Sequence, residues 1–176
     1  TWTKNHVVLN VMDDVKNKLT VLTHGPSGWT RTPMSIGSLE FGTTSVGAVD
    51  ADESDAVWLT VTDYLTPTTP MLAEAGGPPE AVEVMKTMPA FFDASKHVVE
   101  QHFATSKDGT KVPYFLVRAK DVKLDGSNPT LLYGYGGFEV SMTPGYSGGV
   151  GMGWLEKGGV YAVANIRGGG EYGPRW

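Results

Sequence analysis

Glycine is spread very unevenly along this chain of 176 residues. Of its 23 glycines, 15 lie between Gly126 and Gly173, and 8 lie in the first 125 residues. Each glycine in a helix interior costs roughly 1 kcal/mol relative to alanine, so long helices are disfavoured where the glycines gather. We therefore expect the structure to change character in the last part of the chain.

The overall composition is that of a globular protein, with 40% hydrophobic and 19% charged residues. The longest uncharged stretch, residues 140–155, has 16 residues and is too short and too glycine-rich to cross a bilayer. The pI near 5.3 and the lack of basic clusters argue against nucleic acid as a partner. No membrane partner is expected.

The chain has no cysteine, which removes disulfides and thiolate chemistry. This is compatible with either a reducing or an oxidising compartment. The first residues have no signal-peptide pattern. The residues leave the compartment open; we favour the cytoplasm, with the periplasm as the alternative.

The first part of the chain consists of short β-forming runs separated by turn residues. Residues 6–11 and 18–23 flank a polar stretch at 13–17, which predicts a hairpin. Further strands are predicted at residues 46–49, 56–62 and 71–73. This spacing predicts a meander, as in a β-sandwich or the blades of a β-propeller.

A break is predicted at Gly76-Gly77-Pro78-Pro79, followed by a short helix over residues 80–88. We place a domain boundary near Pro89. Residues 1–88 and 89–176 are then expected to be parts of two domains.

After this boundary the pattern is typical of an α/β domain. Residues 98–105 and 111–118 are predicted strands joined at Asp108-Gly109, a strong hairpin signal. Pro113 has no backbone N–H to donate, which predicts that its strand lies at a sheet edge.

Two short apolar runs, residues 130–133 and 160–164, are typical of strands that are buried on both faces of a sheet. About 26 residues separate them, which is enough for a crossover helix. Four glycines lie where that helix should be, so we expect it to begin late, near Trp154. These glycines are Gly148, Gly149, Gly151 and Gly153.

Residues 145–149 match the G-x-S-x-G pattern of a nucleophile elbow around Ser147. An elbow needs a buried strand directly before it, whereas Pro144 lies close before this serine. All four histidines also precede Ser147, although the α/β-hydrolase order places the histidine last. We expect Ser147 to be a loop serine.

The sequence Gly168-Gly169-Gly170-Glu171-Tyr172-Gly173 matches G-x-G-x-x-G after a predicted strand. A dinucleotide site also requires a following helix and an acidic residue about 20 positions further on. Only Pro174 and two further residues follow in this sequence, so neither the helix nor the acidic residue can be checked. A nucleotide-binding domain that uses residues 168–173 remains an alternative.

The sequence Tyr133-Gly134-Tyr135-Gly136-Gly137-Phe138 begins directly after the apolar residues 130–132. In α/β hydrolases, the loop after an early central strand supplies one donor to the oxyanion hole. Glycine lets the backbone approach a reacting carbonyl, and a tyrosine hydroxyl can donate to the oxyanion. The loop is either an oxyanion loop or a glycine-rich turn with two stacking tyrosines.

No metal site is expected. The acidic residues from Asp50 to Asp55 lack the glycine and the final glutamate of an EF-hand, which predicts a solvated turn. His97 and His102 lie five residues apart in or beside a strand and therefore point to opposite faces, so they do not share a metal ion.

Three blocks together resemble the prolyl oligopeptidase family of serine peptidases: residues 132–138, 163–173 and the hairpin at 106–113. The resemblance is specific over about residues 90–176 and looser over 1–88, where Tyr64-Leu65-Thr66-Pro67 is similar to the end of the family's propeller. It implies the C-terminal blades of a β-propeller, followed by the first part of an α/β-hydrolase domain, with no cofactor.

The resemblance also implies an activity and two site residues. The family hydrolyses short peptides on the carboxyl side of proline with a serine nucleophile. Tyr135 falls on the tyrosine whose hydroxyl is the side-chain half of the oxyanion hole. Phe138 falls on a substrate-binding aromatic that packs against proline. Residues 167–173 fall on a structural segment, to which we assign no catalytic role.

The family's serine, aspartate and histidine lie beyond the end of this chain. We therefore expect an internal fragment of a two-domain enzyme, whose partner is the remainder of the parent chain and which is inactive alone. The alternatives are a non-catalytic binding module and the nucleotide-binding domain described above.

Overall fold

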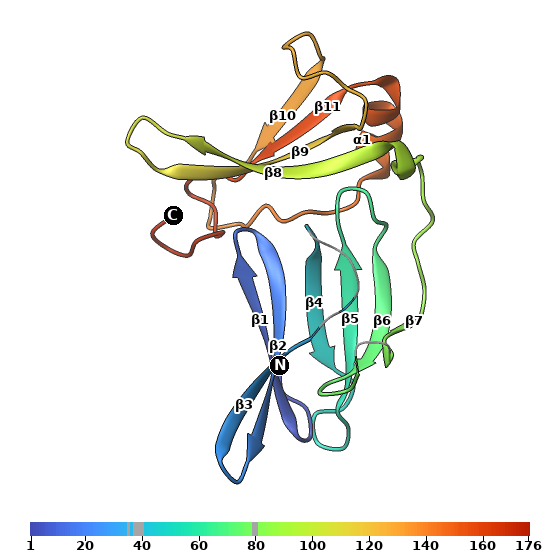
Figure 1. The fold of residues 1–176 in the computed structure, drawn as a ribbon, viewed down its shortest axis with the longest axis vertical. Helices are drawn as coiled ribbons and strands as arrows, with labels where there is room; N and C mark the ends of the chain where they lie inside the picture. Colours follow the sequence, from blue (N-terminus) through green and yellow to red (C-terminus); the bar gives the residue numbers. More distant parts are fainter. Residues whose placement is uncertain (35, 37–40, 79–80) are drawn as a thin grey trace. The chain divides into compact units, whose positions relative to one another are not determined.

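The computed structural model describes residues 1–34, 36, 41–78 and 81–176 (Figure 1). This part of the chain consists mainly of β-strands and contains one α-helix. It divides into two compact units. The first unit comprises Thr1–Asp63 and Thr68–Met88, and the second comprises Tyr64–Pro67 and Pro89–Trp176.

The first unit contains two antiparallel sheets whose strands follow one another in sequence order (Figure 1). The first sheet has the order β1-β2-β3 and the second the order β4-β5-β6-β7. This arrangement confirms the predicted meander, while β3 and β7 were not predicted. The strands are β1 His6–Asp13, β2 Lys16–Gly25, β3 Gly28–Pro33, β4 Thr43–Ala48, β5 Ala56–Thr62, β6 Thr69–Glu74 and β7 Glu83–Val84.

The predicted hairpin at the start of the chain is confirmed. Asp13 pairs with Lys16, so two residues form the turn between β1 and β2. Those residues, Asp14 and Val15, have φ of 47° and 64°, as a two-residue turn of the favoured hand requires. Val15 is a β-branched residue in an unfavourable backbone region, and its side chain is fully buried. Burial of the apolar Val15 side chain is favourable and offsets part of the strain in this turn.

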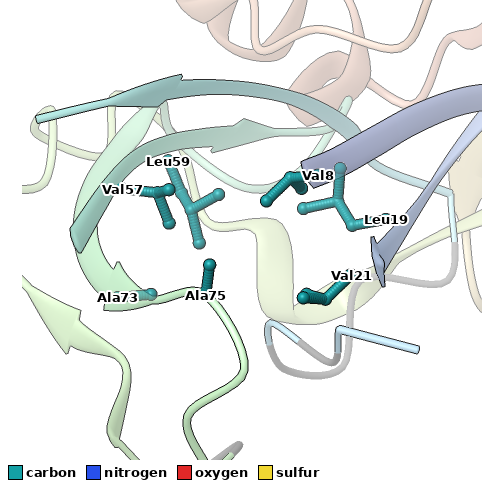
Figure 2. Close-up of a cluster of buried hydrophobic side chains, with 7 residues drawn as sticks. All are labelled: Val8, Leu19, Val21, Val57, Leu59, Ala73 and Ala75. Atoms are coloured by element: carbon teal, nitrogen blue, oxygen red, sulfur yellow. The ribbon is translucent and has the colours of Figure 1, made fainter. Parts of the chain in front are cut away.

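One aliphatic cluster lies between the two sheets of the first unit (Figure 2). In β5, Val57 and Leu59 are buried while Trp58 between them is exposed, which is the alternation expected of a strand with one covered face. Burying side chains of this size contributes about 1.5–3 kcal/mol each. The cluster consists of Val8, Leu19, Val21, Val57, Leu59, Ala73 and Ala75.

The helix predicted over residues 80–88 is wrong for the described residues 81–88. Glu83 and Val84 form β7, which pairs with Met71 and Leu72 of β6. The backbone N–H of Met85 then donates to Pro70. The open edge of β6 thus offers these N–H groups acceptors, and they bond to the sheet instead of within a helix.

The second unit is built on one mixed sheet of order β10-β11-β9-β8 (Figure 1). β10 and β11 are parallel, and the other neighbours are antiparallel. The predicted hairpin and the predicted strand pair are therefore confirmed. The elements are η2 Ala94–Lys96, β8 His97–Thr105, β9 Lys111–Ala119, β10 Thr130–Gly134, α1 Gly148–Gly153, η3 Leu155–Lys157 and β11 Val160–Ala164.

The two parallel strands differ in burial. Val160, Ala162 and Val163 of β11 are buried, as expected. All five residues of β10 are exposed, so the prediction that this strand is buried on both faces is wrong for this chain. The physical reason is its position, because β10 is the edge strand of the described sheet and has β11 as its neighbour.

The prediction that Pro113 lies in an edge strand is wrong, because β9 lies between β11 and β8. The carbonyl oxygen of Pro113 accepts a hydrogen bond from Asn165, just beyond the end of β11. A residue in an antiparallel strand directs its N and its C=O to the same side. The nitrogen of Pro113 therefore faces away from β8, and no bond of the β8–β9 ladder is lost.

The crossover helix α1 begins at Gly148, earlier than predicted, and ends before Trp154. Ser147 is its N-cap, and the Ser147 Oγ accepts from the backbone N–H of Val150. A Cβ atom at Gly151 would overlap the ring of Phe92. Close packing against this ring and a good cap thus outweigh the low helix propensity of glycine. No helix of the described residues is long and apolar enough to cross a membrane.

Candidate active site

Two glycine-rich loops meet at one edge of the sheet in the second unit. One follows β10 and carries Tyr135 and Phe138; the other follows β11 and includes Gly168. Because β10 and β11 are parallel, their carboxyl ends lie at the same edge, where ligands commonly bind in sheets of this kind.

Glycine is required where the two loops touch. A Cβ atom at Gly168 would overlap the carbonyl oxygen of Gly136, and Gly168 has φ of +95°. A Cβ atom at Gly136 would lie 2.5 Å from the carbonyl oxygen of Arg167. The backbones therefore approach one another more closely than any side chain allows. The loop after β11 supports the loop that carries Tyr135.

The phenol of Tyr135 folds back over its own loop. A Cβ atom at Gly137 would lie 2.9 Å from the hydroxyl oxygen of Tyr135, so the glycine makes room for that hydroxyl. The residue is 38% exposed, which leaves its ring accessible to a ligand.

Phe138 projects into solvent with 93% of its surface exposed. It and Glu139 have φ of 56° and 55°, a left-handed conformation that is unfavourable for a bulky residue. Two backbone bonds hold this turn, from Glu139 N–H to the oxygen of Gly168 and from Val140 N–H to the oxygen of Gly137. Such strain often accompanies functional loops.

A buried polar pair fixes the segment that follows. The carboxylate Oε1 of Glu171 accepts from the backbone N–H of Met142 at 2.8 Å. The side-chain amide of Asn165 donates to the oxygen of Met142 at 2.7 Å and to Oε1 of Glu171 at 3.1 Å. Neither Asn165 nor Glu171 was predicted as a site residue. The available signal was two polar residues close after a strand of buried aliphatic residues.

Arg167 links the loop after β11 to the β8–β9 hairpin. Its guanidinium pairs with Asp108 and donates to the hydroxyls of Ser106 and Thr110 at 3.2 and 3.4 Å. The hydrogen bond from Arg167 is the largest cause that lowers the pKa of Asp108 well below its usual range. This contact joins two of the three sequence blocks on which the family resemblance rests.

Ser147 has a structural role in this chain. Its hydroxyl oxygen accepts from Val150 N–H at 3.2 Å, as the cap of α1. It also lines a cavity of about 260 Å³ with Tyr64, Tyr146 and Tyr161. In the second unit, His97 lies between the carbonyl oxygens of Asp93 and Leu155.

Two of the glycines in residues 168–173, Gly168 and Gly170, serve packing between the loops. Gly168 faces Gly136, and Gly170 faces the carbonyl oxygen of Glu139 and the hydroxyl of Ser141. A dinucleotide cradle uses such glycines to admit a pyrophosphate. Here the neighbouring loop lies against them.

The other polar clusters are structural. Asp50 accepts from the backbone N–H groups of Asp52 and Glu53 at 3.0 and 3.1 Å, which confirms the predicted turn. His97 is buried beside Phe92, while His102 lies against Tyr114. The described residues contain no group of three side chains suited to a metal ion.

Comparisons with known proteins agree with these features. The chain is 48% identical over all 176 residues to the uncharacterized peptidase y4nA of Sinorhizobium fredii, of which it covers 24%. It is 40% identical over 136 residues, or 77% of its length, to a prolyl endopeptidase of Elizabethkingia miricola, of which it covers 19%. No family model matches the chain.

The structure has the same relatives. It superposes on a post-proline cleaving enzyme from Rickettsia typhi with a TM-score of 0.83 and 34% identity, covering 100% of this chain and 25% of that one. These similarities place the chain among the peptidases. More narrowly, the chain belongs to the prolyl oligopeptidase family, and it spans about a quarter of the length of its curated relatives.

Proposed function

We propose that the protein containing this chain is a serine endopeptidase that hydrolyses short peptides on the carboxyl side of proline. The observation that carries the proposal is Tyr135, placed with Phe138 on a loop at the carboxyl edge of a parallel strand pair. The name of the Elizabethkingia miricola relative, a prolyl endopeptidase, supports the choice of substrate.

In this proposal the first unit is the C-terminal part of a β-propeller. The second unit is the beginning of an α/β-hydrolase domain. The parallel pair β10–β11 and the antiparallel pair β8–β9 are consistent with the start of such a mixed sheet. The serine, histidine and aspartate would come from the remainder of the protein, so residues 1–176 alone should have no activity.

Tyr135 would act when negative charge develops on the carbonyl oxygen of the scissile bond. A serine attacks the carbonyl carbon, and the Tyr135 hydroxyl donates a hydrogen bond to the oxyanion. The loop that carries this donor is held in place before the reaction, because its backbone at Gly136 packs directly against Gly168. Such a donor favours the transition state over the bound substrate.

Phe138 would form part of the proline site. The residue is 93% exposed and stands at a positive φ of 56°, so its ring is accessible to a ligand. A rigid aromatic face suits the apolar pyrrolidine ring of proline. No charged group is needed for this recognition.

The test uses the full-length protein and a chromogenic Gly-Pro substrate, with Gly-Ala as the matched substrate control. Tyr135→Phe should lower kcat by roughly 10²-fold and change KM little, as for loss of one oxyanion donor. Tyr133→Phe, a neighbouring exposed tyrosine on β10, is the matched control and should retain its kcat. Equal kcat values for the two variants would remove Tyr135 from the mechanism.

A further inference from the structure

A buried carboxylate connects the two loops of the candidate site. Glu171 is only 4% exposed, and Asn165 is fully buried. Together they bind both backbone polar groups of Met142, since Glu171 accepts from its N–H and Asn165 donates to its oxygen. The chain therefore cannot shift at Met142 without breaking hydrogen bonds in a buried environment.

Burying the side chain of Glu171 at this point is energetically unfavourable. No Lys or Arg pairs with it among the described residues, and its second oxygen, Oε2, has no hydrogen-bond partner there. The Oδ1 atom of Asn165 likewise has none among these residues. Burying such groups without partners is unfavourable, so their presence here points to a specific use.

The role of Glu171 follows from the positions of the hydrogen bonds that attach the Tyr135 loop to the segment after β11. The loop with Tyr135 and Phe138 is attached near its middle by the bond from Glu139 N–H to Gly168. It is attached again at Met142, through Glu171. Both attachments lead to the single segment 165–171 after β11, so Glu171 completes a two-point support.

We propose that Glu171 is a positioning residue, which fixes the loop of Tyr135 and Phe138 by presenting a buried hydrogen-bond acceptor to Met142 and Asn165. This inference rests on the proposed function, because it assigns Glu171 to the same oxyanion loop. The bonds at Oε1 need an acceptor at the right reach; a negative charge is not required for them.

Two substitutions separate reach from charge in the full-length protein. Glu171→Asp keeps the charge but withdraws the acceptor, and it should lower kcat roughly 10- to 100-fold, as expected for a displaced catalytic group. Glu171→Gln keeps the acceptor without the charge, and its kcat should stay within about threefold of the unmodified protein. Equal losses in both variants would show a need for charge and would overturn the proposal.

Glu156→Asp is the matched control. Glu156 also accepts from a backbone N–H, that of Asp93 at 3.0 Å, and it precedes β11 whereas Glu171 follows it. Its kcat should not change. A loss equal to that of Glu171→Asp would indicate general destabilisation of the second unit and would overturn the positioning role.

A double-mutant cycle with Tyr135→Phe identifies the group through which Glu171 acts. With the hydroxyl absent, Glu171→Asp should lower kcat by less than about threefold, because the oxyanion donor that Glu171 positions is gone. A full additional loss would overturn the inference while leaving post-proline cleavage intact. If the unmodified protein cleaves Gly-Pro and Gly-Ala equally, the proposed function itself fails, and the inference with it.

Discussion

Gly47 in β4 of the first unit has no atom within 4 Å of the Cβ that an alanine would carry, whereas Gly168 in the second unit would place that atom against the carbonyl oxygen of Gly136. The two units also differ in how far their strands are buried. The strands around Leu59 direct aliphatic side chains into one cluster, while β10 exposes all five of its residues.

The difference shows where each unit depends on its side chains. The first unit is held by apolar side chains from facing sheets, so volume matters most there. At the candidate site the backbone contacts itself, and the absence of a side chain at Gly136 and Gly168 is the requirement. Substitutions that change volume should therefore lower stability alone in the first unit, and both stability and activity at the candidate site of the second.

The largest effect is expected from Leu59→Ala in the first unit. Leu59 is fully buried, and its truncation should lower the free energy of unfolding of that unit by about 2–5 kcal/mol. Denaturant unfolding of the full-length protein measures this. The kcat, assayed well below the unfolding transition, should stay unchanged. A large fall in kcat for the folded variant would break the contrast between the units.

A somewhat smaller loss is expected from Gly168→Ala. The new Cβ would overlap the carbonyl oxygen of Gly136, and φ of +95° is unfavourable for alanine. Together these should lower stability by about 2–3 kcal/mol. Because the displaced backbone is next to Tyr135, kcat should also fall, by roughly 10²-fold.

Gly47→Ala is the matched control for that substitution. Its Cβ would enter open space, so both kcat and the unfolding midpoint should stay near those of the unmodified protein. Equal effects of the two glycine substitutions would mean that the contact between the loops has no special role.

Much of the fold followed from local pattern. The bounds predicted for β5 and β11 coincide with those observed, because both strands carry unbroken runs of β-forming residues. The β3 strand was missed, since Gly28-Trp29-Thr30-Arg31-Thr32-Pro33 is exposed and has no apolar alternation. It forms by pairing with β2 across the two-residue turn at 26–27, a contact that the exposed sequence of the strand itself does not indicate.

The same limit applies to the candidate site. Tyr135 and Phe138 were identified because their motif follows a strand directly. Glu171 and Asn165 were not, because their role depends on Met142, which lies 29 and 23 residues away in sequence. The early start of α1 was missed for the same reason, as it depends on close packing between Gly151 and the distant Phe92.

A smaller effect is expected from Ser147→Ala. Removal of this N-cap of α1 should lower stability by about 1 kcal/mol. The kcat for Gly-Pro cleavage should be unchanged, because the structure gives Ser147 a capping role. Loss of all activity in a folded Ser147→Ala variant would make this residue the nucleophile and would reverse our assignment.

The smallest effect concerns two ion pairs, one in each unit. Arg118 binds Glu100 through two hydrogen bonds of 3.0 and 2.7 Å, and this contact is the largest cause that lowers the pKa of Glu100 from its usual 4.5. A lowered pKa means that the pair stabilises the fold above about pH 4.5 and that this contribution is lost as the pH falls. Glu100→Gln should therefore lower stability by about 0.5–1 kcal/mol at pH 7, and the difference should vanish in acid.

Asp13→Asn, which removes the more exposed pair with Lys18 in the first unit, should shift the unfolding midpoint less. Unfolding curves of both variants at several pH values measure the difference. A larger shift for Asp13→Asn would contradict the expectation that the two-bond pair of the second unit contributes more than the exposed pair of the first.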